Sequence, residues 1–231
     1  MNRDLEKLDN PVWHALQETH REYAMDFGNI QFYHPDYCPF GGFEQRENIA
    51  DGIEKYAAHC DNFFVVGEKP SIPGSLELKN ELVCEQMVIN TTLNVESAEI
   101  IVPLTRQHAQ LLWDLVNLVQ PGYFRIKTSQ LGNYYGIFID DKLVAVTGER
   151  MQVNEGVEVS AVVTHPDHTG KGYAKQLVAH TVNNILQRDK LPFLHVSATN
   201  TGAINLYRKL GFTTRRKISF WNFIVPGTKQ L

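Results

Sequence analysis

A glycine turn between a strand-like run and a helix-like run most restricts the folds open to this chain. Residues 157–165, VEVSAVVTH, form an apolar run typical of a buried strand, and a proline and the glycine turn 170–172 follow it. Over residues 174–185 the apolar side chains recur at spacings of three and four, which predicts an amphipathic helix. Free N–H groups at such a helix start favour an anion, so the turn is a candidate phosphate site.

Two common phosphate-binding motifs do not fit this turn. The P-loop of nucleotide-binding proteins requires a glycine where this chain has His165, and a serine or threonine where it has Gly172. The dinucleotide-binding pattern requires a third glycine, where this chain has Lys175. Neither ATP nor NAD is therefore indicated. On these residues alone, a turn that binds nothing is an equal alternative.

Charge and cysteine content exclude several other classes. The 231 residues carry a formal net charge of −4, so no basic surface for nucleic acid is expected. Cys38, Cys60 and Cys84 are far apart, which favours neither a disulfide framework nor a metal site. His165 and His168 indicate a solvated turn better than a metal-binding pair. No apolar run is long enough for a membrane span or a secretory signal, so a cytoplasmic location without membrane contact is expected.

The first part of the chain predicts a separate α/β domain. Residues 10–58 suggest helix, loop and helix, and the loop 34–43, HPDYCPFGGF, is rich in aromatic residues. This loop could cover an acceptor pocket or form a local packing cluster. A short apolar run at 62–69 and a weakly alternating run at 71–90 follow. The short polar stretch near residues 91–98 marks a boundary, which gives domains 1–95 and 96–231.

The second part alternates between strand and helix patterns and predicts a mixed α+β sheet. Thr105 and Asn200 or Thr201 are suited to cap helix starts, and Gly211 to end a helix. No internal sequence repeat is visible. Strands are predicted at 98–105, 133–140, 142–151, 157–165, 192–198 and 215–225, and helices at 106–119, 174–185 and 202–210.

Two segments resemble the GNAT superfamily of acyl-CoA-dependent N-acyltransferases. Residues 160–178 match its strand followed by Gln/Arg-x-x-Gly-x-Gly/Ala, except that Thr169 replaces Gln or Arg. Residues 197–212, SATNTGAINLYRKLGF, match its later segment. The resemblance covers about residues 98–225. Within the superfamily, these segments look most like those of a poorly characterised bacterial branch with an extra N-terminal domain. It implies a GNAT-like acyltransferase fold after an α/β domain, which the sequence faintly suggests is a degenerate GNAT-like half.

The resemblance implies transfer of an acetyl group from acetyl-CoA to a primary amine by direct attack, without a metal. The acceptor would be a small molecule or a peptide, and closing strands that pair would allow a homodimer. One alternative is a longer acyl-CoA or an amino-acid acceptor such as glycine. Another is a non-catalytic module that binds acyl-CoA or a partner.

The resemblance also implies roles for individual residues. Glu158, fourteen positions before Gly172, is the candidate general base, and a structural carboxylate, a water relay or Glu149 are the alternatives. Tyr207 is the candidate acid for the departing thiolate, and packing is its alternative role. The residues expected to contact acetyl-CoA are Val162, Val163, Thr164, Thr169, Gly170, Lys171, Gly172, Tyr173, Ala174, Asn200 and Ala203.

Overall fold

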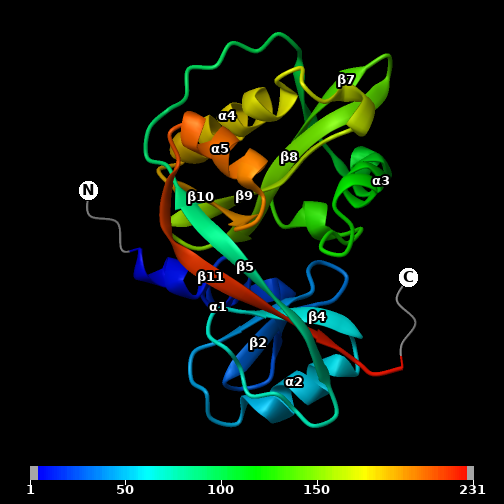
Figure 1. Cartoon of the computed structure of the whole chain (residues 1–231), viewed down its shortest axis with the longest axis vertical. Coiled ribbons are helices and arrows are strands. Elements are labelled where there is room, and N and C mark those ends of the chain that lie inside the picture. The colour runs from blue at the N-terminus through cyan, green and yellow to red at the C-terminus, as the bar shows by residue number, and fades with distance from the viewer. Residues whose placement is uncertain (1–4, 228–231) are drawn as a thin grey trace.

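A computed structural model describes residues 5–227 as one mixed sheet with helices packed on it (Figure 1). The strand order is β1-β2-β3-β4-β11-β5-β10-β9-β8-β7-β6. The strands are β1 (Ala24–Asp26), β2 (Ile30–Tyr33), β3 (Phe40–Phe43), β4 (Asn62–Val66), β5 (Glu77–Val88), β6 (Ile101–Leu104), β7 (Tyr134–Ile139), β8 (Lys142–Gln152), β9 (Gly156–Thr164), β10 (Leu191–Ser197) and β11 (Thr213–Ile224). The α-helices are α1 (Pro11–Gln17), α2 (Ile49–Ala57), α3 (Ala109–Val119), α4 (Tyr173–Leu186) and α5 (Thr201–Lys209).

The predicted mixed α/β fold is confirmed, and every strand and helix predicted after residue 98 is present. Local signals explain why. Thr105 and His108 form a capping box that leads into α3 through a short 3-10 turn. Asp140 and Asp141 both adopt positive φ in the tight turn between β7 and β8. Gly211 ends α5 at φ 97°.

The prediction of helix, loop and helix for residues 10–58 is wrong in its middle. Both helices exist as α1 and α2, but the segment between them contains the strands β1, β2 and β3. All four residues of β2 and of β3 are buried, so neither strand shows the alternation that reveals a half-exposed strand. Gly41 lies against the Phe32 ring, where a Cβ would come within 2.3 Å of it. The aromatic segment is therefore partly core strand.

Two long strands connect the two halves of the sheet. β5 comes from the first half of the chain, yet it pairs with β10 on one side and with β11 on the other. β11 ends the second half, yet it pairs with β4. In Figure 1 these two strands run as one diagonal ribbon between the upper and lower parts of the molecule. Each half is therefore completed by a strand from the other.

The same strand order recurs in both halves. β3 is parallel to β4 with α2 between them, and β9 is parallel to β10 with α4 between them. Each of these pairs is followed in space by the partner half's long strand and then by its own. The arrangement is what a GNAT-like first half would show, although no repeat is visible in the sequence. The domain boundary at residue 95 stays a prediction.

Helices on the second half position the site. α4 packs against β7 to β10, and α3 packs against β8 and β9 through a separate apolar cluster. α5 joins the cluster of α4 through Ile204 and Tyr207. Among residues 5–227, no helix combines the length and the apolarity that a membrane span requires.

Candidate active site

Strand β9 carries a bulge and then separates from β10. Val163 pairs with Val146 and Ser160 with Gly148, so β9 has an extra residue opposite β8, and Ala161 there adopts φ 50°. The parallel pairing of β9 with β10 ends at Glu158. The two strands therefore separate beyond Glu158. Separated strands leave edge N–H and C=O groups that an extended ligand such as a pantetheine arm can pair with.

The glycine turn has the geometry of an anion cradle. Gly170 and Gly172 adopt φ 77° and 78°, and Gly172 is the N-cap of α4. Gln176 donates its N–H to the Gly172 carbonyl, so the N–H groups before it belong to the first, open turn of the helix. A Cβ on Gly170 would meet nothing within 4 Å, so the loop faces open space. The hydroxyl of Thr169, in place of a long side chain, donates back to the Pro166 carbonyl at 3.1 Å.

Two cavities collect most of the predicted site residues. A cavity of about 650 Å³ is lined, among others, by Thr164, Thr169, Gly170, Lys171, Gly172, Tyr173, Ala174 and Ala203. A second, which we call the inner cavity, has about 210 Å³ and is lined in part by Val162, Asn200, Ala203 and Tyr207. Ala203 lines both, so the cavities meet at the start of α5. Val163 lines neither, because its side chain packs in the α3 cluster.

Tyr207 lies between the core and the inner cavity. It packs in the α4–α5 cluster with 7% of its surface exposed, and burial raises the pKa of its phenol to about 12. The hydroxyl therefore stays protonated at neutral pH and can donate a proton. Asn200 caps α5, because its Oδ1 accepts the N–H of Ala203 at 3.1 Å, and it lines the same cavity.

Glu158 is buried in an ion pair. Arg150 donates from Nε and Nη2 to its two oxygens, each at 2.8 Å, and His195 Nδ1 lies 2.8 Å from Oε1. The Met151 N–H also points at Oε2, at 3.3 Å. Burial opposes ionisation of this carboxyl, but the charge and hydrogen bonds of Arg150, together with the hydrogen bond from His195, outweigh it and lower its pKa to about 2. Glu158 lies behind Arg150 and His195, which line the inner cavity.

The hydrogen bonds around His195 define its tautomer. Gln86 accepts from Arg215 through Oε1 at 2.9 Å and donates from Nε2 to the Leu8 carbonyl at 2.7 Å, which fixes its amide orientation. The same Nε2 lies 3.0 Å from His195 Nε2, which must therefore accept. The Nδ1 of His195 then donates to the Glu158 carboxylate.

The alternative base Glu149 lies elsewhere. It is fully buried and forms an ion pair with Arg188, just after α4, and Asn133 also donates to it. Its neighbour Arg150 points to the opposite side of β8, as successive strand residues do. Glu149 lines neither of the two cavities.

The sequence did not indicate the polar residues beside Glu158 or the aromatic wall of the inner cavity that β3 and β11 contribute. Arg150, His195 and Gln86 were not singled out, nor were the wall residues Phe40 on β3 and Phe220 on β11. A signal was present, because Arg150, Glu158 and His195 are charged or polar residues inside three otherwise apolar strand runs. Phe40 and Phe220 gave no such signal in the sequence, because only the tertiary pairing of β3, β4, β11 and β5 brings them to the cavity.

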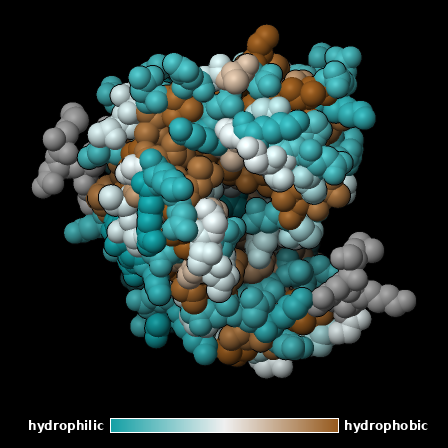
Figure 2. Space-filling model, turned by 45° about the horizontal axis from the view of Figure 1, so that its top comes forward, coloured by the Kyte–Doolittle hydropathy of each residue, from teal (hydrophilic) through white to brown (hydrophobic). Residues whose placement is uncertain are grey.

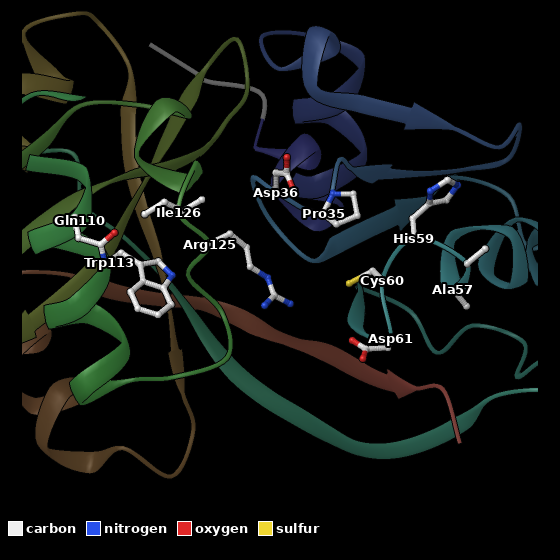
Figure 3. A pocket seen from close by; sticks show the side chains of 11 residues that line it. Pro35, Asp36, Ala57, His59, Cys60, Asp61, Gln110, Trp113, Arg125 and Ile126 are labelled. Atoms are coloured by element: carbon white, nitrogen blue, oxygen red, sulfur yellow. The ribbon is translucent and has the colours of Figure 1, made fainter. Parts of the chain in front are cut away.

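The widest cavity carries little of this chemistry. It has about 790 Å³ and lies between the two halves, with walls from residues 35–36 and 57–61 on one side and 110–126 on the other. Figure 3 shows Arg125 extending into it between Trp113 and the pair Cys60 and Asp61. None of the predicted catalytic or cofactor residues lines it. The inner cavity is the better candidate site, although it is smaller.

The described residues contain no group of three or more His, Cys, Asp and Glu side chains arranged to hold a metal. His165 and His168 lie in a short 3-10 turn, where His165 Nδ1 accepts the Asp167 N–H at 3.2 Å. All three cysteines are buried as free thiols.

Comparisons with known proteins point to the same superfamily as the two sequence segments. The family model described as FR47-like protein matches residues 134–221, which include both GNAT-like segments. A protein from Novosphingobium aromaticivorans, assigned to the GNAT family of acetyltransferases, is 29% identical, with 94% of this chain and 98% of that one covered and a TM-score of 0.87. The chain is thus similar to GNAT-family acetyltransferases in fold over nearly its whole length and in sequence over its second half. None of the curated proteins compared with it matches.

More distant structures share the GNAT fold over nearly the whole chain. A GCN5-related N-acetyltransferase-like protein from Streptococcus suis is 14% identical, with a TM-score of 0.63 and coverage of 94% of this chain and 96% of that one. A tandem GNAT protein from the clavulanic acid biosynthesis pathway is also 14% identical, with a TM-score of 0.55 and coverage of 87% and 79%. The GNAT fold thus extends over both halves, and acyl transfer from an acyl-CoA is the activity that it supports.

Proposed function

We propose that the protein is an N-acetyltransferase that moves an acetyl group from acetyl-CoA to a primary amine by direct attack. One observation carries this proposal: the left-handed glycine turn at the start of α4 opens into a cavity that continues, at Ala203, to the inner cavity beside Tyr207 and the separated β9. With the diphosphate of acetyl-CoA bound at the turn, the pantetheine arm would extend along β9 toward the inner cavity. The thioester would then lie near Val162.

The reaction forms one bond and breaks one. It also removes a proton from the amine nitrogen and delivers a proton to the departing thiolate. The neutral amine attacks the thioester carbon, the C–N bond forms and the C–S bond breaks. Backbone N–H groups near Val162 and Val163 would stabilise the oxyanion. Tyr207 would donate its phenolic proton to the departing thiolate and regain one from solvent. The amine nitrogen loses its extra proton in the same cycle.

For Glu158 we propose a positioning role in place of the base role expected from the resemblance. A carboxylate with a pKa near 2 takes up a proton poorly at neutral pH, and both oxygens already accept hydrogen bonds. Glu158 would hold Arg150 and His195 at the cavity, and water would carry the amine proton away. In Glu158→Gln the rate should fall while the acid limb of the pH–rate profile keeps its midpoint. A shifted midpoint would restore Glu158 as the base.

Release of free thiol from acetyl-CoA, measured with a panel of amines, tests the proposed function. We expect amine-dependent release and an N-acetylated product by mass spectrometry. Binding of acetyl-CoA without release for any amine would instead indicate a binding module. Comparison with longer acyl-CoAs measures how far the inner cavity admits a larger acyl group.

A further inference from the structure

The charge of the inner cavity restricts the acceptor. Among the described residues that line it, Arg150 is the only charged side chain, and no Asp or Glu is present. An enzyme that selects a polyamine or a lysine side chain needs carboxylates to hold the additional positive charge. Arg150 is paired with Glu158 behind the wall, so the cavity itself presents the remaining guanidinium donors and no carboxylate, which suits an anionic group better than a second ammonium.

Arg150 has N–H donors that Glu158 does not use. Its guanidinium carries five N–H groups, and Glu158 takes those of Nε and one of Nη2. Nη1 donates to none of the residues of the described chain, and 12% of the side chain is exposed at the cavity. The guanidinium also lies 4.7 Å from the centre of the Phe40 ring, which fixes its plane. Glu158 and Phe40 thus orient Arg150, and its remaining N–H groups are available to a ligand.

We infer that the acceptor is a small free amino acid, whose carboxylate binds Arg150 while its amine faces the thioester near Val162 and Tyr207. This inference rests on the proposed function and names its substrate class. Arginine suits the role because its planar fork matches a carboxylate. A carboxylate and an amine on the same small molecule could meet Arg150 and Tyr207 within one cavity, since both residues line it.

The size and the walls of the cavity refine the substrate class. Its volume is about 210 Å³. An apolar cavity of about 150 Å³ accommodates benzene, so only a small acceptor can share this space with an acetyl group. Phe40, Tyr123, Phe124 and Phe220 provide aromatic walls. An apolar amino acid fits these walls better than a charged one, and a peptide amino terminus is too large.

Matched pairs of amines test the inference. Leucine is compared with isopentylamine, and phenylalanine with phenylethylamine, in the thiol-release assay, with rates corrected for the neutral fraction of each amine. A charged hydrogen bond contributes about 1.5–3 kcal/mol, so kcat/KM should favour the amino acid on the order of tenfold to a hundredfold. Equal or better use of the amines without a carboxylate would overturn the inference and leave the proposed function intact. No release with any acceptor would contradict the proposed function itself.

Substitution of Arg150 separates recognition from folding. Arg150→Lys should raise KM for leucine about tenfold or more and leave KM for acetyl-CoA unchanged. The control is Arg188→Lys, which alters the other arginine paired with a buried glutamate, Glu149, away from the cavity. If Arg150→Lys is unstable, Arg150→Gln combined with Glu158→Gln removes both charges together. Equal loss with leucine and isopentylamine in these variants would show that Arg150 is structural only.

Calorimetry gives a readout that does not depend on turnover. Leucine and isopentylamine are titrated separately into the full chain saturated with CoA. We expect leucine, but not isopentylamine, to give heat of binding with the wild type. In Arg150→Lys the heat of leucine binding should disappear. Binding of isopentylamine with equal affinity would count against a carboxylate site.

Discussion

At the scale of single residues, Tyr207 combines burial with access to the inner cavity. In Tyr207→Phe the ring still fills its place in the α4–α5 cluster, and only the hydroxyl is lost. We expect kcat to fall on the order of a hundredfold, within the range of general acid catalysis, while KM for acetyl-CoA changes little. Steady-state kinetics measures both. A fall in acetyl-CoA affinity with kcat preserved would assign Tyr207 to packing.

The ion pair of Glu158 makes stability depend on pH. Its pKa is about 2 in the folded protein against an ordinary value of 4.5, so the folded state favours the charged form. The stabilisation is fully present above pH 4.5 and is lost as the pH falls through 2. Urea unfolding between pH 5 and pH 2, as approximate limits, should show a steeper loss of stability for the wild type than for Glu158→Gln. Parallel pH curves would show that this carboxyl does not couple to folding.

The sequence located residues whose positions depend on local order. Gly172, Asn200 and Tyr207 lie at fixed positions within a strand–turn–helix unit, so a motif can locate them. The ionisation of Glu158 depends on Arg150 from one neighbouring strand and His195 from another. Local spacing carries no information about pairing across strands, so the sequence could not reveal the ion pair of Glu158, and its role as a base stays a prediction.

At the scale of elements, the turn before α4 depends on glycine conformation. A Cβ on Gly172 would meet only Gln176 Nε2, at 3.9 Å, so its cost comes from the backbone at φ 78°. Gly172→Ala should lower the free energy of unfolding by about 1 kcal/mol and also weaken acetyl-CoA binding, because the methyl group occupies the cradle. Gly28→Ala is the matched control, at φ 85° in the turn before β2. In Gly28→Ala the free energy of unfolding should fall by a similar amount, while the affinity for acetyl-CoA stays unchanged.

Element prediction succeeded where the patterns were amphipathic. The periodicity of α4 and the turn residues Asp140 and Asp141 gave correct elements. The fully buried β2 and β3 were missed, because a short apolar strand has no period that separates it from a loop or a buried helix.

At the scale of the whole molecule, the exchange of β5 and β11 predicts that the halves fold together. Residues 96–231 alone would leave β10 without β5, and β11 without both of its neighbours. We expect this fragment to be unfolded or aggregated when expressed alone. Co-expression with residues 1–95 should give a soluble complex by size-exclusion chromatography. A cooperative unfolding transition for the isolated fragment would contradict this expectation.

The pair of long strands also governs how a substrate reaches the inner cavity. Leu82 and Cys84 of β5 and Phe220 of β11 line it, and the same strands hold the two halves side by side. The face shown in Figure 2 is hollowed near its middle. Hinge closure, in which two lobes swing about a flexible connection, would break backbone hydrogen bonds along the β5–β11 ladder. The β5–β11 ladder therefore opposes a hinge motion of the two halves, and we expect the inner cavity to accept its substrate without such closure.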